Sequence, residues 1–544
     1  MKLILISLIS LVSATVSAVN PILRTNREWL AVYHDGVCQQ HPWVTSPQVE
    51  VDSLMSSAET VTFASDIDTI SVSGLKPYES FDIDVVTASG DTALTRVVRL
   101  PQVIYENVPN RLKRSNGDIR LSREQALFDM DALMYALSQI HPDIYSVVGQ
   151  ERLLRAFEDA KRNMPDTLTT VDLYRIAAPI VSLIGDGHTC LRFPFNDMFT
   201  REMMRMPLYV KVNTDMSVNV TASLDSLVPS GAHLEAINGV PMNEMVTEML
   251  AYVSGERRHF KLSRVNDYFT ALFEMIYGGK SEYEIAFMTS GDKEVRKVLL
   301  PAVKWEEMDG RILSSESSEN RRIAPYDYSI VSGKNIAVME FNECDNVKGM
   351  KQFCDSMFAD LRARGIKKLI IDVRNNGGGN SMVGDVLLGY IARKPFTQFS
   401  KSLVKVSPMT ARMIGCSDGT ATISFKSVDQ EQYIRPLSVE EGHFDGSVLL
   451  LTSNNTFSSA SSFAWAFKES DAGKTVGEET GGMNVCYGDI LGWRAPISGL
   501  GCTISWKRFW QMNADETDIH GALPDYEVPA EKALDKALVL LSKL

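Results

Sequence analysis

Strand-like and helix-like segments alternate from residue 325 onward, and this alternation restricts the possible folds more than any other feature of the chain. Residues 335–341 and 368–373 have the apolar, β-branched composition of buried strands, and residues 347–364 and 381–393 have helical spacing. The pattern repeats as a strand at 447–452, a helix at 458–469 and a strand at 475–476. Repeated strand–helix–strand units predict a largely parallel sheet covered by helices, with ligands bound at the carboxyl ends of the strands.

The residues before this 325–540 core differ in character from one region to the next. Residues 21–110 lack helical periodicity and contain short alternating runs, which predicts a β-sandwich module. Ser122 is suited to cap a helix, and residues 120–200 are expected to be largely helical. Residues 205–300 return to strands, and their run Gly231-Ala232-His233-Leu234-Glu235-Ala236-Ile237-Asn238-Gly239 resembles the core of PDZ domains, although Ile-Asn-Gly also suits a plain hairpin. The fold class expected is therefore multidomain α/β.

Residues 1–18 have the pattern of a secretory signal peptide. Lys2 precedes a short apolar run, and Val16-Ser17-Ala18 supplies small residues at the cleavage positions, with an uncleaved anchor as the alternative. The formal net charge of −13, or −14 once Lys2 is removed, excludes a generally basic nucleic-acid binder. No later run approaches about 18 apolar residues. We expect an exported protein, periplasmic or extracellular, that does not bind nucleic acid and has no stable membrane span after cleavage.

Cysteine and histidine patterns give no sign of a metal site. The chain has 7 cysteines, which are scattered, and it contains neither a CxxC pair nor an HExxH motif. We therefore expect no metal and no other cofactor.

Two polar loops follow strands of the expected core. Glycines 377–379 would expose backbone N–H groups at a helix N-terminus, which suits an oxyanion or a phosphate, with a plain structural turn as the alternative. Residues 452–463 place several serines at a strand-to-helix junction. A serine there has its hydroxyl at the positive end of the helix dipole and the next N–H free as an oxyanion donor. Serines are also ordinary helix caps, and spacing alone does not choose among them.

A serine nucleophile needs a base, which directs attention to the histidines in polar, turn-like settings. His188 lies in the glycine-flanked segment Gly185-Asp186-Gly187-His188-Thr189 at the end of the helical region. His443 and His520 are its rivals, and a capping or loop histidine is the structural alternative.

Four ordered motifs resemble the C-terminal-processing and tricorn-core family of serine peptidases, also called tail-specific proteases. They are Asp372-Val373-Arg374-Asn375-Asn376-Gly377-Gly378-Gly379, Thr456-Phe457-Ser458-Ser459-Ala460, Val476-Gly477-Glu478-Glu479-Thr480-Gly481-Gly482 and Gly521-Ala522-Leu523-Pro524-Asp525. The resemblance extends over roughly residues 120–540 and implies a ClpP/crotonase-like βαβ peptidase core with a helical region and a PDZ-like insert before it. Residues 21–110 lie outside it.

The resemblance also implies roles for single residues. It places the nucleophile at Ser458 and the oxyanion donors at the backbone N–H groups of Gly378 and Ser459. The processing branch takes a lysine as base, but residues 483–489 contain none, whereas the tricorn-like branch takes a histidine, here His188. That branch also has an acidic residue six positions before the proline of its last motif, which is Asp518 here where the family more often has Glu.

The expected function is that of an exported serine endopeptidase acting on peptide or protein substrates. Non-catalytic members of the same fold resemble retinoid carriers, so a peptide- or hydrophobic-ligand-binding protein is the alternative. The sequon-like Asn454-Asn455-Thr456 precedes Ser458, where a glycan would obstruct substrate, and this favours a bacterial envelope. The sequence carries no signal for an oligomeric state.

Overall fold

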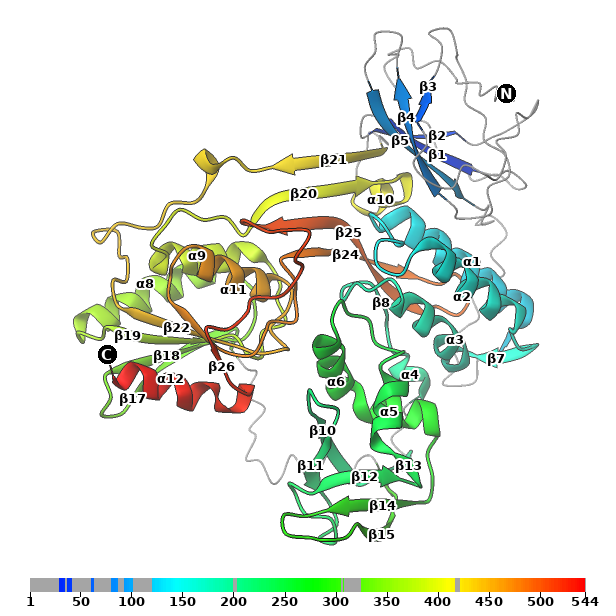
Figure 1. The fold of residues 1–544 in the computed structure, drawn as a ribbon, viewed down its shortest axis with the longest axis horizontal. Helices are drawn as coiled ribbons and strands as arrows, with labels where there is room; N and C mark the ends of the chain where they lie inside the picture. Colours follow the sequence, from blue (N-terminus) through cyan, green and yellow to red (C-terminus); the bar gives the residue numbers. More distant parts are fainter. Residues whose placement is uncertain are drawn as a thin grey trace.

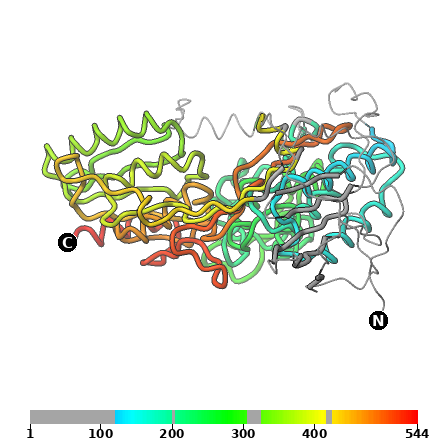
Figure 2. The backbone as a smooth tube through the Cα atoms, turned by 90° about the horizontal axis from the view of Figure 1, so that it is seen from above, coloured from blue at the N-terminus to red at the C-terminus, as the bar shows by residue number. Residues whose placement is uncertain are grey.

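The computed structural model describes residues 120–198, 203–304, 307, 324–415 and 421–543, together with strands between residues 29 and 100. The described parts form an elongated multidomain α/β molecule (Figure 1, Figure 2). The predicted fold class is confirmed at that level. None of the helices in these ranges combines the length and the apolar character needed to cross a bilayer.

The helical region begins where a capping box fixes the start of its first helix. The Ser122 hydroxyl accepts from the Gln125 amide, and the Gln125 side chain accepts from the Ser122 amide. Thr169 and Asp172 form the same arrangement at the start of α3. The elements, in order, are β6 (Arg120–Ser122), α1 (Arg123–Ile140), α2 (Gln150–Arg162), β7 (Thr167–Thr169), α3 (Thr170–Ser182), β8 (Cys190–Leu191) and α4 (Phe195–Met198).

The next region is an antiparallel sheet with two main helices. Its strand order is β10-β11-β12-β14-β15, with β13 paired to β12 through a turn in which Asn238 and Gly239 both have positive φ. Its elements are β9 (Met204–Arg205), β10 (Leu208–Val212), β11 (Val218–Ser223), β12 (His233–Ile237), β13 (Val240–Pro241), α5 (Met242–Met249), α6 (Arg258–Tyr277), β14 (Glu282–Met288), β15 (Arg296–Pro301) and β16 (Val303–Lys304). The PDZ-like character predicted for residues 205–300 stays a prediction.

The core sheet has the order β17-β18-β19-β22-β23-β26 and is parallel except for the β17–β18 pair. Leu369 and Ile371 pack with α8, α9 and α11 on one face, whereas Ile370 packs with α12 on the other. The elements are β17 (Tyr326–Val331), β18 (Ile336–Phe341), α8 (Val347–Ala363), β19 (Lys368–Asp372), α9 (Ser381–Ile391), β22 (Ser447–Thr452), α11 (Ser459–Glu469), β23 (Lys474–Gly477), β26 (Tyr526–Glu527) and α12 (Ala533–Ser542). The carboxyl ends of β19 and β22 therefore meet at one edge.

A second large sheet links the core to the helical region (Figure 1). Its central strands are β20 (Phe399–Val406), β21 (Ala421–Ser427), β24 (Val485–Arg494) and β25 (Gly501–Gln511), and β8 pairs with β25. The described N-terminal strands continue the same sheet because β2 pairs with the edge of β21. They are β1 (Trp29–His34), β2 (Val37–His41), β3 (Thr60–Thr62), β4 (Ser80–Val86) and β5 (Thr92–Leu100). The described N-terminal strands lie in one sheet with β20, β21, β24 and β25, and the β-sandwich module predicted for residues 21–110 stays a prediction.

Candidate active site

Ser458 occupies a strained turn between β22 and α11. Its φ of 53° and ψ of −130° are rare for a residue with a side chain, and its hydroxyl makes no capping bond to the helix. Bonds to the glycine loop hold the turn, because the Phe457 amide donates to the Asn376 carbonyl and the Thr456 hydroxyl donates to the Val373 carbonyl. Ser458 is thus not an ordinary helix cap, and its Oγ is available for chemistry.

The imidazole of His188 meets that hydroxyl. Nε2 of His188 lies 2.9 Å from Oγ of Ser458, across 270 residues of sequence. The ring packs on Phe457 with centroids 4.4 Å apart, and its side chain is 13% exposed. The Thr503 hydroxyl on β25 donates to the His188 carbonyl at 2.8 Å. The structure therefore brings together the predicted nucleophile and the predicted base, with the ring shielded but reachable.

The carboxylate beside His188 is Asp186, a residue to which the sequence analysis gave no role. Asp186 Oδ1 accepts from the His188 backbone amide at 2.9 Å and lies 3.7 Å from the ring Nδ1. Its Oδ2 accepts from the Ser505 hydroxyl at 2.6 Å and faces His141 Nε2 at 3.3 Å. The Asp143 amide donates to Nδ1 of His141, so the proton of the neutral His141 ring sits on Nε2 and points at Asp186. The Asp-x-His spacing is the signal by which Asp186 could have been found.

Asp186 is ionised in this setting. Complete burial would raise the pKa of Asp186, but hydrogen bonds from His141 and His188 and the electrostatic effect of both residues hold it well below its usual value. A charged carboxylate near Nδ1 favours a proton on that nitrogen, which leaves Nε2 as the acceptor facing Ser458.

The structure does not bring Asp518 to His188. Its side chain is 77% exposed and lies 3.7 Å from His520 Nε2, because a turn from Asp515 directs it to the surface. The rival histidines bond elsewhere: His443 Nε2 lies 2.9 Å from the Ala392 carbonyl, and His520 Nδ1 lies 2.6 Å from the Gly521 carbonyl.

The glycine loop presses against the nucleophile. Gly378 has φ of 103°, and a Cβ built on it would lie 2.6 Å from Ser458 Cβ and 2.9 Å from the Ser459 nitrogen. A side chain is therefore excluded at this position. The Gly378 amide donates to Asn376 Oδ1 at 2.9 Å, whereas the Ser459 amide opens α11 and has no partner within that helix. Both predicted oxyanion donors thus lie next to Ser458. In the structure without substrate, the Gly378 amide is already bonded to Asn376.

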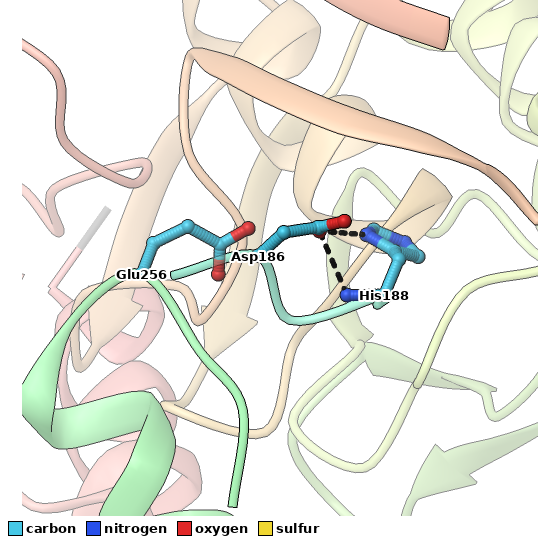
Figure 3. Close-up of side chains that lie close together, drawn as sticks. All are labelled: Asp186, His188 and Glu256. Carbon is cyan, nitrogen blue, oxygen red and sulfur yellow. Dashed lines mark hydrogen bonds and ion pairs between the residues drawn. The ribbon is translucent and has the colours of Figure 1, made fainter. Parts of the chain in front are cut away.

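Glu256, in the segment between α5 and α6, is a further carboxylate that sequence reasoning missed. Figure 3 shows it beside Asp186 and His188. One side-chain nitrogen or oxygen atom from each of the three residues lies within 4.8 Å of the other two. Burial and the charge of Asp186 raise the pKa of Glu256 to about 7, although the electrostatic effect of His188 and nearby backbone amides oppose the rise. The oxygens of Asp186 already accept from Ser505, His141 and the His188 amide, so the three residues form an acid–base cluster and are not assigned as metal ligands.

A polar cavity of about 510 Å³ adjoins the nucleophile loop. Residues of β10, α6 and the core loops enclose it, including Lys211, His259, Ser263, Arg374 and Asn455. The Ser263 hydroxyl donates to Asn455 Oδ1, which ties α6 to the loop that carries Ser458.

Ser458, in its strained turn, and the shielded His188 lie together at the carboxyl edge of the parallel sheet. This arrangement of a serine and a histidine is that of a serine-type peptidase. Residues 335–528, which form the core of the chain, match the model of peptidase family S41. The resemblance found in the sequence is therefore confirmed.

Two solved structures of CPAF share the fold at low sequence identity. The crystal structure of mature CPAF is 13% identical, has a TM-score of 0.55, and aligns over 77% of this chain and 96% of its own. Mature CPAF complexed with lactacystin is also 13% identical, with a TM-score of 0.55 over 77% of this chain and 97% of that one. The photosystem II D1 C-terminal processing protease is 14% identical, with a TM-score of 0.39 over 77% of this chain and 97% of that one.

Proposed function

We propose that this serine peptidase is an exported endopeptidase in which Ser458 is the nucleophile and His188 the general base. The observation that carries the proposal is the 2.9 Å approach of His188 Nε2 to Ser458 Oγ. This separation is within reach for direct proton transfer. The substrates are peptides or proteins, because the family cleaves peptide bonds.

The proton moves along one line of atoms. His188 Nε2 accepts the Ser458 proton as Oγ attacks the peptide carbonyl, and the imidazolium later returns a proton to the leaving amine. The Asp186 carboxylate lies 3.7 Å from Nδ1, so its charge favours the tautomer that this transfer requires and opposes the positive charge that forms. Water then hydrolyses the acyl-enzyme.

The oxyanion is held by the backbone amides of Ser459 and Gly378. The Ser459 amide sits at the positive end of α11 and has no partner within the helix. The Gly378 amide donates to the neutral amide oxygen of Asn376, and an oxyanion would compete for it because charge-assisted hydrogen bonds are stronger. The oxyanion hole is therefore completed as charge develops on the substrate.

Export follows from the signal-peptide pattern of residues 1–18, which lie outside the described residues. A setting in the bacterial envelope, periplasmic or extracellular, agrees with the environment of Asn454. Its side-chain amide is buried and donates to the Glu479 carbonyl at 2.9 Å, so a glycan on that nitrogen would not fit.

A fluorophosphonate probe and fluorescein-labelled casein test this proposal. The wild-type protein should hydrolyse casein and become labelled at Ser458, whereas Ser458→Ala should lose both activities. Ser462→Ala is the matched control. The Ser462 hydroxyl lies in the first turn of α11 and donates to the Ser458 carbonyl at 3.4 Å, and it does not face His188. This variant should retain labelling.

The alternative, a non-catalytic carrier of peptides or apolar ligands, predicts no labelling of the wild-type protein. Labelling that survives His188→Ala would overturn the assignment of the base and leave the nucleophile standing.

A further inference from the structure

Glu256 is a buried carboxylate for which the residues described provide no hydrogen-bond partner. Both side-chain oxygens are shielded from solvent, and the nearby backbone amides of Gly187 and Glu256 do not complete a hydrogen bond to them. One of them lies so close to Gly187 that a Cβ on that glycine would approach within 3.0 Å. A buried charged group left in this state costs free energy unless an opposite charge forms nearby.

The groups around Glu256 come from separate elements. The loop before β8 supplies Asp186 and His188, and β24 supplies the thiol of Cys486, whose pKa is raised by burial and by the charges of Glu256 and Asp186. α6 supplies Phe260, which stacks on Phe457 with ring centroids 4.2 Å apart. Within these surroundings, the group that gains positive charge during acyl transfer is His188.

We infer that Glu256 is a positioning residue for the base: its carboxylate stabilises the imidazolium that His188 becomes when Ser458 attacks. The inference rests on the proposed function. In that step the Ser458 proton passes to Nε2, a bond forms from Oγ to the carbonyl carbon, and the carbonyl π pair moves to oxygen. Glu256 and Asp186 exchange no proton. The Glu256 charge is thus unmatched in the resting enzyme and matched once imidazolium forms, which is the condition for lowering a barrier.

The pH dependence carries a specific signature. The pKa of Glu256 is raised to about 7, so its charge is lost as the pH falls through that value. Loss of this charge slows the reaction. Removing the carboxylate permanently makes imidazolium harder to form, so the acid midpoint of the rate should move to lower pH while the maximal rate falls.

The test measures the rate at which a fluorophosphonate labels Ser458 between pH 5 and pH 9. In this reaction Oγ bonds to phosphorus, fluoride leaves and the hydroxyl proton passes to His188. We expect Glu256→Gln to lower the rate at pH 8 by roughly tenfold or more and to shift its acid midpoint to lower pH. Glu256→Asp keeps a carboxylate and should keep the wild-type midpoint with an intermediate rate.

Glu274→Gln is the matched control. Glu274 is also a buried glutamate with an unpartnered oxygen, Oε2, and burial raises its pKa, but its neighbours are the Arg205 charge and the Tyr283 hydroxyl, away from His188. This variant should leave the midpoint unchanged. A fall in rate after Glu256→Gln without any shift of the midpoint would reduce Glu256 to a packing role and overturn the inference.

Thermal melting gives a second, independent readout. Because Glu256→Gln removes an unmatched buried charge, it should raise the melting temperature at pH 8 and have less effect at pH 5. A lower melting temperature of Glu256→Gln at pH 8 would show that Glu256 is not an unmatched buried charge. Failure of the wild-type protein to react with the probe at any pH would instead refute the proposed function itself, and the two failures are thereby distinguished.

Discussion

Asp186 and Asp518 are the two aspartates that compete for the acidic role beside His188. Asp186 is buried and faces the ring at 3.7 Å, whereas the side chain of Asp518 is 77% exposed and pairs with His520. We expect Asp186→Asn to reduce the labelling rate of Ser458 by about 10²- to 10⁴-fold, because the imidazolium loses its opposing charge and the tautomer is no longer fixed. Asp518→Asn should stay within about twofold of wild type.

Ser505→Ala separates the catalytic effect of Asp186 from a structural one. It removes one hydrogen bond to Asp186 Oδ2 and leaves the carboxylate charged. Its cost should be about 1 kcal/mol of stability with a much smaller loss of labelling. Equal losses for Asp186→Asn and Asp518→Asn would refute this assignment.

The sequence predicted single residues as far as short motifs specify them. His188 lies in a glycine-flanked turn and Ser458 at a strand-to-helix junction, and both settings have an informative local pattern. Asp186 lies in the same turn as His188, but an aspartate beside glycine has ordinary capping roles, and only the fold shows its contact with the ring. Glu256 had no local signal, because its burial depends on Phe260, Cys486 and a loop distant in the chain.

At the scale of elements, the glycine loop meets the start of α11, and the space available for a side chain differs between Gly377 and Gly378. Gly378 has φ of 103° and no room for a Cβ against Ser458, whereas a Cβ on Gly377 would meet nothing within 4 Å. We expect Gly378→Ala to lower the labelling rate at least about a hundredfold, because an oxyanion donor is displaced. Gly377→Ala should remain within a few-fold of wild type.

Circular dichroism and melting curves distinguish a displaced donor from general unfolding. Gly378→Ala should retain its secondary structure with a lower melting temperature, since its backbone strain is confined to one turn. Similar rates for the two alanine variants would show that the loop relaxes freely and that the close approach at Gly378 has no catalytic role.

The strand and helix alternation of the core could be predicted because each segment carries its own periodicity. The sheet of β20, β21, β24 and β25 could not be assembled in this way, since its two local pairs, β20–β21 and β24–β25, are joined by the long-range pairing of β20 with β25. The N-terminal strands show the same limit: their alternation predicts strands, whereas pairing of β2 with the edge of β21 decides that they extend an existing sheet.

For the whole molecule, the candidate site is assembled from three regions of the chain. The helical region ends in Asp186 and His188, the α5–α6 segment contributes Glu256, and the core contributes Ser458 and Gly378. The family match at residues 335–528 includes only the core residues of this set. The base therefore depends on how the helical region docks onto the long sheet.

The pairing of β8 with β25 provides that docking, and Thr503 is its hydrogen-bonded contact with the base. The Thr503 hydroxyl donates to the His188 carbonyl at 2.8 Å, and the Ser505 amide donates to the Thr189 hydroxyl at 3.0 Å. Thr503→Val keeps the volume and removes the donor, so we expect about 1 kcal/mol less stability together with about a tenfold lower labelling rate. The acid midpoint should not move, because no charge changes.

Ser138→Ala is the control for the loss of a hydroxyl. Ser138 is buried in α1 and donates to the Tyr135 carbonyl at 2.8 Å, so its removal should cost similar stability while leaving labelling intact. Melting curves measure the first quantity and the fluorophosphonate rate the second. If Thr503→Val slowed labelling no more than Ser138→Ala at matched stability, the β8–β25 contact would serve folding alone. A selective loss of rate would instead show that the distance between base and nucleophile is set by the long sheet, outside the core that carries Ser458.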